Sequence, residues 1–350
     1  MNKSYLLLLL FIPFISSCLE NDRPSSFNNF SKQGDDTNNY LFDNQKTNKL
    51  AGPDKIKIFG EVVRELDIEL SELPVRTVVV KEVLPEKGER TFKGTFRYDG
   101  YSLEDILIDV ELEKKSGFNP ITDLYVKVHS KDGSHVVVSW AEIFYPVKHH
   151  QQIIARAVSR HIPFKTPDVK YPLPENPGLI IASDLMTCRN ISQPVAIEIC
   201  SYSGNFPSAD LDSLYWPTLT MKGFIEEKLV LGELPSSLTP RESDMIFYGR
   251  GRGIHGVNPF EGYYLSDLLA LYIDTDSENI QKGLVIASAP DGYRSVFTLS
   301  EIMNRNDRLE TLIMDQHNYE DAGKFSLVVT GDFFSDRAMK ALNKLEFIKE

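Results

Sequence analysis

The sequence contains two motifs that occur twice in the same order. Residues 100–107 (GYSLEDIL) match residues 262–269 (GYYLSDLL), and residues 132–143 match residues 291–302 (DGYRSVFTLSEI). The offset is 162 residues for the first motif (262 − 100) and 159 residues for the second (291 − 132). A shared order at a nearly constant offset indicates a duplicated unit rather than a chance match, and it sets the expected number of domains.

The repeat extends beyond these motifs in both directions. Residues 60–74 parallel residues 223–235, and residues 179–189 (LIIASDLMTCR) parallel residues 327–337 (LVVTGDFFSDR). Each unit is therefore about 130–150 residues long, the size of one ordinary domain. Solenoid repeats are much shorter, at about 20–50 residues. We therefore predict two tandem globular domains, at 55–200 and 219–350, joined by a linker at 201–218.

The N-terminus is typical of an export signal. Lys3 precedes an apolar run at 6–14, which is shorter than the roughly 20 residues of a transmembrane helix. The run ends in Ile-Ser-Ser-Cys at 15–18, which resembles the lipobox of bacterial lipoproteins. The resemblance implies that residues 1–17 are a signal peptide and that Cys18 is acylated, which would anchor the chain to a membrane. An ordinary secretory signal with an incidental cysteine is the alternative.

The segment after Cys18 is predicted to be a disordered tether. Residues 18–54 are rich in Asn, Ser, Asp and Gln and lack apolar periodicity, so they cannot bury enough surface to offset the entropy of ordering. Leu19 stands where an Asp would be the usual signal for retention in the inner membrane. The resemblance to lipoproteins therefore favours the outer membrane of a bacterial cell envelope, with the protein facing the periplasm.

The charge of the chain argues against one class of partner. The formal net charge is −12 at pH 7, and removal of the signal with Lys3 makes it −13. Nucleic-acid binding requires basic stripes that contact phosphates, so nucleic acid is not an expected partner. Beyond Cys18 only Cys188 and Cys200 remain. They could pair in an oxidising compartment, but they flank a predicted strand at 195–199 that would hold them apart.

The predicted fold class is α+β, mostly β, with short helices. Asp-Gly at 132–133 and at 291–292 predicts a β-hairpin in each copy, because such turns require positive φ. Apolar residues at i, i+3 and i+4 predict short helices at 103–107 and 265–271. A further helix is expected at 153–159.

Later in each copy the patterns predict more short elements. Helices are expected to start at 140–143 and 299–302. A final pair of strands is expected around 184–189 in the first copy and around 332–337 in the second.

As a set, these motifs resemble the molybdopterin-binding domain of the sulfite oxidase family. The closest form is its compact bacterial branch, the oxidoreductase molybdopterin-binding-like domains. The second copy matches better, over 219–348, than the first, over 56–199. The resemblance implies a mostly-β α+β fold, two sulfite-oxidase-like domains in tandem, and molybdopterin chemistry in catalytic members.

The residue that binds the metal in catalytic members is missing from both copies. There a Cys thiolate between the first strands and the Gly-x-x-Leu-x-Asp-Leu-Leu helix binds the molybdenum. Here the corresponding intervals, 75–99 and 236–261, contain no cysteine. Cys188 is no substitute, because it aligns with Asp336 near the end of the unit. A bound metal is therefore not expected, and molybdopterin remains only an alternative.

One glycine-rich loop in the second copy is a candidate anion or cofactor site. Residues 248–256 (YGRGRGIHG) contain Tyr248, Arg250, Arg252 and His255 among four glycines. Glycine lets backbone N–H groups approach an anion, and arginine pairs bidentately with phosphate or sulfate. The loop is expected to face the hairpin that carries Arg294. The alternative is an exposed hairpin loop whose charges only aid solubility.

The histidines at 149, 150 and 161 are expected to lie in a surface loop, because no cysteine or carboxylate completes a metal set at a known spacing. Two functions then remain open. The first is a non-catalytic envelope lipoprotein that binds a small anion or a partner protein, or has a structural role. The second is a molybdopterin-dependent oxidoreductase, or a subunit of a redox complex, in the envelope.

Overall fold

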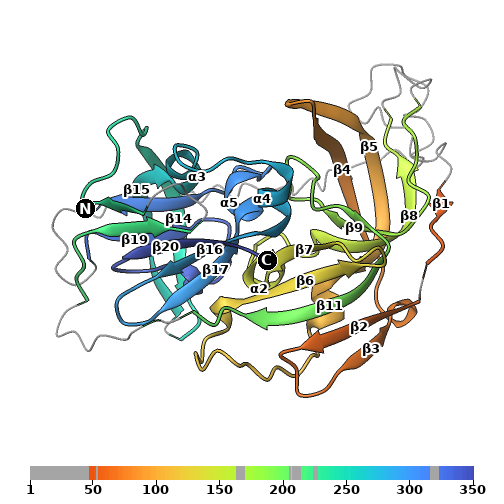
Figure 1. Ribbon diagram of the computed structural model, residues 1–350, viewed down its shortest axis with the longest axis horizontal. Helices are drawn as coiled ribbons and strands as arrows, with labels where there is room; N and C mark the ends of the chain where they lie inside the picture. The colour runs from red at the N-terminus through yellow and green to blue at the C-terminus, as the bar shows by residue number, and fades with distance from the viewer. Residues whose placement is uncertain are drawn as a thin grey trace, which may run out of the picture.

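The computed structural model describes residues 47–52, 54–162, 170–204, 206, 214–223, 228–251, 253–315 and 323–350. The predicted signal peptide, Cys18 and most of the predicted tether lie outside this part of the chain. Strands dominate the described residues and the helices are short (Figure 1), which confirms the predicted mostly-β α+β fold class.

The first half of the chain forms two sheets. A six-stranded sheet has the order β10 (Ile191–Ser192), β9 (Gly178–Ile181), β8 (Gln152–Arg160), β5 (Glu89–Ser102) and β4 (Arg76–Glu86), with β1 (Asn48–Lys49) paired to β8. A five-stranded sheet has the order β3 (Leu66–Glu69), β2 (Lys55–Gly60), β11 (Pro194–Ser201), β6 (Leu124–Ser130) and β7 (His135–Ser139). The short helices are α1 (Leu103–Leu107), α2 (Trp140–Phe144) and the 3₁₀ turns η2 (Leu70–Glu72) and η3 (Ile121–Asp123).

The second half also forms two sheets. The five-stranded one has the order β13 (Leu229–Leu231), β12 (Leu219–Lys222), β20 (Lys344–Lys349), β16 (Gly283–Ser288) and β17 (Arg294–Thr298). The four-stranded one has the order β14 (Arg241–Gly249), β15 (Gly253–Tyr264), β18 (Thr311–Asp315) and β19 (Phe325–Val329). The helices are α3 (Leu265–Leu269), α4 (Ser277–Lys282), α5 (Leu299–Met303) and the 3₁₀ turn η4 (Ser335–Arg337).

The strand orders of the two halves correspond. β3-β2-β11-β6-β7 has the same connectivity as β13-β12-β20-β16-β17, and β4-β5-β8-β9 the same as β14-β15-β18-β19. The one parallel pairing in each five-stranded sheet also corresponds, as β2 with β11 and β12 with β20. Within the described residues, every named sheet draws its strands from one half only.

Local sequence signals account for the short elements. The predicted hairpins are β6–β7 and β16–β17, and their turn glycines have φ of +88° at Gly133 and +85° at Gly292. Ser139 caps α2 by accepting a hydrogen bond from the Glu142 N–H, and Thr298 caps α5 in the same way. Such hydroxyl caps satisfy N–H groups that a helix start leaves free.

The structure corrects three expectations. Residues 153–159 are not helical but belong to β8, which is hydrogen-bonded on both sides, to β5 and β9, so that sheet pairing overrides the local pattern. The strand pair expected around 184–189 is present as β9 with β10, but the segment around 332–337 has only an isolated bridge between Leu327 and Met339, and the 3₁₀ turn η4 lies within it. The tether also ends before residue 54, because β1 pairs with β8 and Leu50 is buried.

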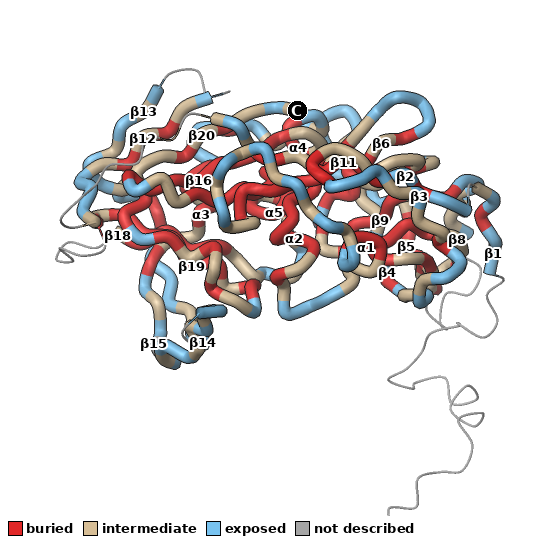
Figure 2. Tube along the Cα trace, turned by 90° about the horizontal axis from the view of Figure 1, so that it is seen from below, coloured by how far each residue is buried: buried red, intermediate tan, exposed pale blue. Residues whose placement is uncertain are grey.

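Each half has its own apolar core, and a smaller apolar cluster joins them. That cluster contains Tyr125 and Val137 from the first half with Leu284, Ile286 and Val296 from the second. Figure 2 shows buried segments running through the centre of both halves, while the β14–β15 hairpin extends from the body. The halves therefore pack against each other through the outer faces of their five-stranded sheets.

Candidate functional site

Three charged residues that recur in both copies form buried ion pairs, and in the first copy they are Glu142, Asp184 and Arg189. Arg189, which is 0% exposed, reaches Asp184 with Nη2–Oδ1 and Nε–Oδ2 distances of 2.6 and 2.8 Å. It also contacts Glu142, with Nη2–Oε1 and Nη1–Oε2 distances of 2.6 and 3.0 Å. One guanidinium therefore holds the glutamate of the motif at 132–143 and the aspartate of the motif at 179–189 together.

The second copy repeats this arrangement with equivalent residues. Arg337 contacts Asp332 at 2.7 and 2.8 Å, and its Nη1 lies 2.9 Å from Glu301 Oε2. The Arg337 side chain is 1% exposed. The repeat in the sequence had already marked the recurring Glu and the recurring Asp-x-x-x-x-Arg positions. It did not indicate that the Arg forms ion pairs with both acids.

Hydrogen bonds between equivalent positions join the two networks. Ser139 Oγ donates to Glu301 Oε1 at 2.8 Å, and Thr298 Oγ1 donates to Glu142 Oε2 at 3.1 Å. Each contact is the counterpart of the other, with donor and acceptor drawn from opposite halves. This is the pattern of an isologous, two-fold interface, formed here within one chain.

The backbone has the same reciprocity. The Leu185 N–H donates to the Asn304 carbonyl and the Phe333 N–H donates to the Tyr145 carbonyl, both at 2.7 Å. The isolated bridges between Asp184 and Arg305 and between Pro146 and Asp332 form another such pair. The two halves are thus related by an approximate two-fold axis that passes near the ion-pair networks.

The electrostatics of the networks follow from burial and pairing. Burial raises the pKa of Glu142, but the nearby Arg189 guanidinium outweighs it, so that the pKa ends below its ordinary value. At Glu301 burial dominates over Arg337, and the pKa is raised. These side chains are engaged with one another and shielded from solvent, so the arrangement is suited to holding the halves together rather than to contacting a substrate.

The glycine-rich loop is the turn of the β14–β15 hairpin. Arg250 Nε lies 2.7 Å from Asp336 Oδ2, and its guanidinium lies 4.9 Å from the Tyr145 ring and 5.4 Å from the Phe334 ring. Tyr248 stacks on Phe334 at a centroid distance of 5.6 Å. Tyr248 and Arg250 therefore lie close together, as expected. The Asp336 carboxylate lies beside them, which the sequence of the loop did not predict.

The other candidate residues are placed differently. His255 is exposed and packs edge-on against Phe247, with ring centroids 5.5 Å apart, and Arg252 lies outside the described residues. Tyr293, from the expected hairpin, does reach this region and donates a hydrogen bond to the Asp336 carbonyl. No sequence pattern pointed to Tyr145, and Asp336 was noted only as the residue aligned with Cys188.

Arg294 points away from the loop and toward the first half of the chain. Its Nη2 lies 3.2 Å from Asp123 Oδ2, and its guanidinium lies 4.3 Å from the Phe118 ring and 4.5 Å from the Phe206 ring. Burial lowers the pKa of Arg294, while Asp123 opposes that effect. The residue links the halves, and in this position it does not meet a ligand held by Arg250.

The histidines do not assemble a metal site within the described residues. His149 and His150 both contact Glu104, with Nδ1–carboxylate distances of 3.0 and 3.2 Å. His150 has a φ of +59°, and neither of these two histidines lies in a strand. Among the described residues no cluster of three or more His, Cys, Asp or Glu side chains is arranged to hold a metal ion.

The residues at the expected cofactor position do not fit a molybdenum centre. The hairpins β4–β5 and β14–β15 carry no thiol. Cys188 lies elsewhere, buried 3.8 Å from Ser277 Oγ, and burial raises its pKa, which disfavours a thiolate. Cys200 is also free, so the two cysteines form no disulfide with each other.

No helix among the described residues is both long enough and apolar enough to cross a membrane. No protein-family model matches the sequence. A search of curated proteins finds no match either.

Proposed function

We propose that this chain is a lipid-anchored protein of the bacterial envelope whose two sulfite-oxidase-like halves form a non-catalytic binding or structural module. The observation that supports this proposal is the closed network around Arg189 and Arg337. In both copies, one recurring Glu, one recurring Asp and one recurring Arg neutralise one another inside the protein. Catalytic acids and bases must reach a reacting group, and these side chains are almost completely buried.

The lack of the metal thiolate in both copies points in the same direction. Soft thiolate ligation fixes the metal in catalytic members of the resembled family. One divergent copy beside an intact one would be compatible with a working enzyme. The lack of the thiol in both copies favours a module whose fold serves to bind a ligand or partner, or has a structural role.

Where this module binds a ligand, we propose a small anion at Arg250 in the second copy. The Arg250 side chain is 46% exposed despite its contact with Asp336. An anion that competes with Asp336 could therefore reach the guanidinium. Two aromatic rings beside it exclude water on one side, which strengthens charge-assisted hydrogen bonds.

The test is elemental analysis of full-length protein purified from its own host. Molybdenum and extractable pterin should both be absent at stoichiometric levels, measured by mass spectrometry of the metal and fluorescence of the oxidised pterin. A one-to-one content of molybdenum would overturn the proposal and establish the alternative, a molybdopterin-dependent oxidoreductase or redox-complex subunit. A catalytic member of the sulfite oxidase family that has the cysteine, purified in parallel, is the positive control.

A further inference from the structure

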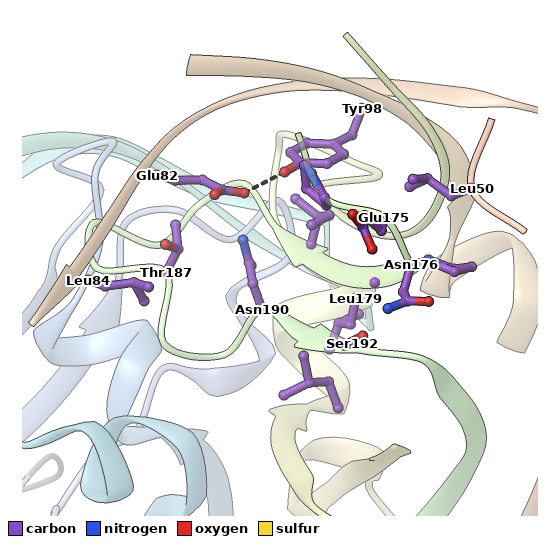
Figure 3. Close-up of a pocket in the computed structure, with 15 residues that line it drawn as sticks. Leu50, Glu82, Leu84, Tyr98, Glu175, Asn176, Leu179, Thr187, Asn190 and Ser192 are labelled. Atoms are coloured by element: carbon purple, nitrogen blue, oxygen red, sulfur yellow. Dashed lines mark hydrogen bonds between the residues drawn. The ribbon is translucent and has the colours of Figure 1, made fainter. Parts of the chain in front are cut away.

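A cavity of about 330 Å³ lies in the first half of the chain, far in sequence from the glycine-rich loop. It opens between the β4–β5 hairpin and the segments around β9 and β10 (Figure 3). This volume is at the lower end of the roughly 300–1,000 Å³ typical of small-molecule sites. Its apolar walls come from Leu50, Leu84, Pro174, Pro177, Leu179, Ile180 and Ile191.

The polar side of the cavity is acidic. Glu82 and Glu175 both line it, and no lining residue among those described is basic. Among the described residues, the only hydrogen bond that Glu82 receives there comes from the Tyr98 hydroxyl, at 2.5 Å from Oε1. Burial raises the pKa of Glu82 above its ordinary value, and the bond from Tyr98 only partly compensates. A half-buried carboxylate without a cationic partner is energetically costly, and a positively charged ligand group would remove that cost.

Asn190 supplies a donor with a defined direction. Its Oδ1 accepts a hydrogen bond of 3.0 Å from the Ile181 N–H, which fixes which end of the amide is nitrogen. Its Nδ2 is buried and has no hydrogen-bond partner among the described residues. In Figure 3 this nitrogen lies on the side of Asn190 that faces Thr187 and Glu82. A buried donor of this kind calls for an acceptor.

The walls of the cavity are held in place without a ligand. The Thr187 N–H and hydroxyl both donate to the Val83 carbonyl, at 2.8 and 3.0 Å, which ties the segment before Asn190 to β4. The Asn190 N–H in turn donates to the Thr187 carbonyl at 3.1 Å. Because Glu82 neighbours Val83, these bonds hold the carboxylate and the amide in a fixed relation. Such preorganisation reduces the entropic cost of binding.

We propose that this cavity binds a small organic cation, with an ammonium group against Glu82, an adjacent acceptor against Asn190 and a short apolar chain along the leucine and proline wall. The acidic lining disfavours anions, including a pterin pyrophosphate. This site is therefore separate from the anion site at Arg250, and it does not depend on whether that site is used.

Leucinamide is a suitable probe because it carries an ammonium group, a neighbouring carbonyl and a branched apolar chain. Binding is measured by titration calorimetry with the mature full chain at pH 6.5, where an α-amino group with a pKa of about 7.7–8.0 is charged. Three relatives serve as matched controls. N-acetyl-leucinamide lacks the charge, leucine adds a carboxylate, and 3-methylbutylamine lacks the acceptor. Each should bind at least about fivefold more weakly than leucinamide.

The variant Glu82→Gln should weaken leucinamide binding by at least about tenfold, because it removes the charge and keeps the shape. Glu86→Gln is the control, since Glu86 lies at the exposed end of β4 and pairs with Lys93. It should bind as the wild type does. Thermal denaturation of Glu82→Gln verifies that the variant is folded.

Two results would overturn the proposal. The first is no detectable binding of leucinamide to the wild type at millimolar concentration. The second is leucinamide binding whose affinity is the same in Glu82→Gln as in the wild type, or an affinity for N-acetyl-leucinamide and leucine that equals the affinity for leucinamide. The anion titrations at Arg250 are unaffected by either result, so this inference and the proposed function can fail separately.

Discussion

The Ser139 hydroxyl, which caps helix α2, also donates a 2.8 Å hydrogen bond to Glu301 in the other half of the chain. Thr298, its counterpart, caps α5 and donates to Glu142. Each helix start is therefore fixed to the motif acid of the other copy. This reciprocity explains why the Ser/Thr-x-x-Glu pattern recurs at both positions, since each copy supplies both a cap and an acceptor across the same axis.

Replacement of Arg189 by Met should destabilise the protein strongly. The substitution leaves Glu142 and Asp184 buried without a cation, which is expected to cost about 3–5 kcal/mol of unfolding free energy. Urea denaturation followed by circular dichroism measures the change. Lys57→Ala is the control, because Lys57 forms an exposed ion pair with Glu65 and should cost no more than about 1 kcal/mol. Equal losses in the two variants would show that the network does not stabilise the fold.

Ser139→Ala should cost more than the same change at Ser102. Both serines accept a bond of 3.0 Å from the third residue of a short helix, so both substitutions remove a cap worth about 1 kcal/mol. The Ser102 hydroxyl donates only within its own half, to Asp105 at the partly buried start of the same helix. The Ser139 hydroxyl donates to the buried Glu301 of the other half, and the loss of this bond should add about 1 kcal/mol. Chemical denaturation of the two variants gives the difference. Identical losses would argue against a stabilising contact between the halves.

Glu82→Gln should stabilise the protein at neutral pH. The folded-state pKa of Glu82 is raised, so the folded protein binds a proton more tightly than the unfolded chain does. The stability this contributes is complete below the ordinary glutamate pKa and is lost as pH rises through the folded-state pKa. The melting temperature of the wild type should fall relative to the variant as pH increases over that interval. Parallel curves for the two proteins would contradict this.

Asp336→Asn should increase anion binding at the glycine-rich loop. The carboxylate now occupies Arg250, so the wild type should bind sulfate only weakly. Removal of the competing charge frees a guanidinium whose charge-assisted bonds contribute on the order of 1.5–3 kcal/mol. Calorimetry with sulfate, phosphate and a pterin phosphate compares Asp336→Asn with Arg250→Ala/Arg252→Ala. If all three proteins gave the same signal, the loop would be ordinary exposed surface.

Cys18→Ser should abolish lipid attachment. The apolar run that ends in Ile-Ser-Ser-Cys predicts acylation of the Cys18 thiol. Cells fed a fatty-acid analogue should label the wild type and not the variant, as seen after gel separation. Cys188→Ser, a buried cysteine elsewhere in the chain, should be labelled like the wild type. Labelling of Cys18→Ser at the wild-type level would rule out this anchor.

Much of the local structure could be predicted because its signals lie close together in the chain. The Asp-Gly turns at 132–133 and 291–292 form the expected hairpins, since only a short sequence is needed to specify positive φ. The short helices α1, α2 and α5 follow from a capping hydroxyl and two or three apolar residues. The wrong assignment at 153–159 has the opposite cause. Its neighbours in the sheet, β5 and β9, lie far away in sequence, and their hydrogen bonds override the local pattern.

The candidate site was predicted less well, for the same reason. Tyr248 and Arg250 come from one hairpin and do lie together, but Asp336 comes from a turn 86 residues after Arg250 (336 − 250) and changes the charge of the site. Arg294 was expected nearby, yet it pairs with Asp123 across the interface. A side chain in a strand can point to either face of the sheet. Here the packing between the two halves determines the face to which Arg294 points.

By itself the sequence determined that the chain repeats, which residues recur, and that strands alternate with short helices, because these properties depend on neighbouring residues. Only the tertiary structure decided that Glu142 and Glu301 serve opposite halves, that Arg189 and Arg337 are buried rather than catalytic in position, and that Glu82 and Asn190 share a cavity. Those relations join residues far apart in the chain. They arise when two sheets pack on each other and exclude water, which no local pattern records.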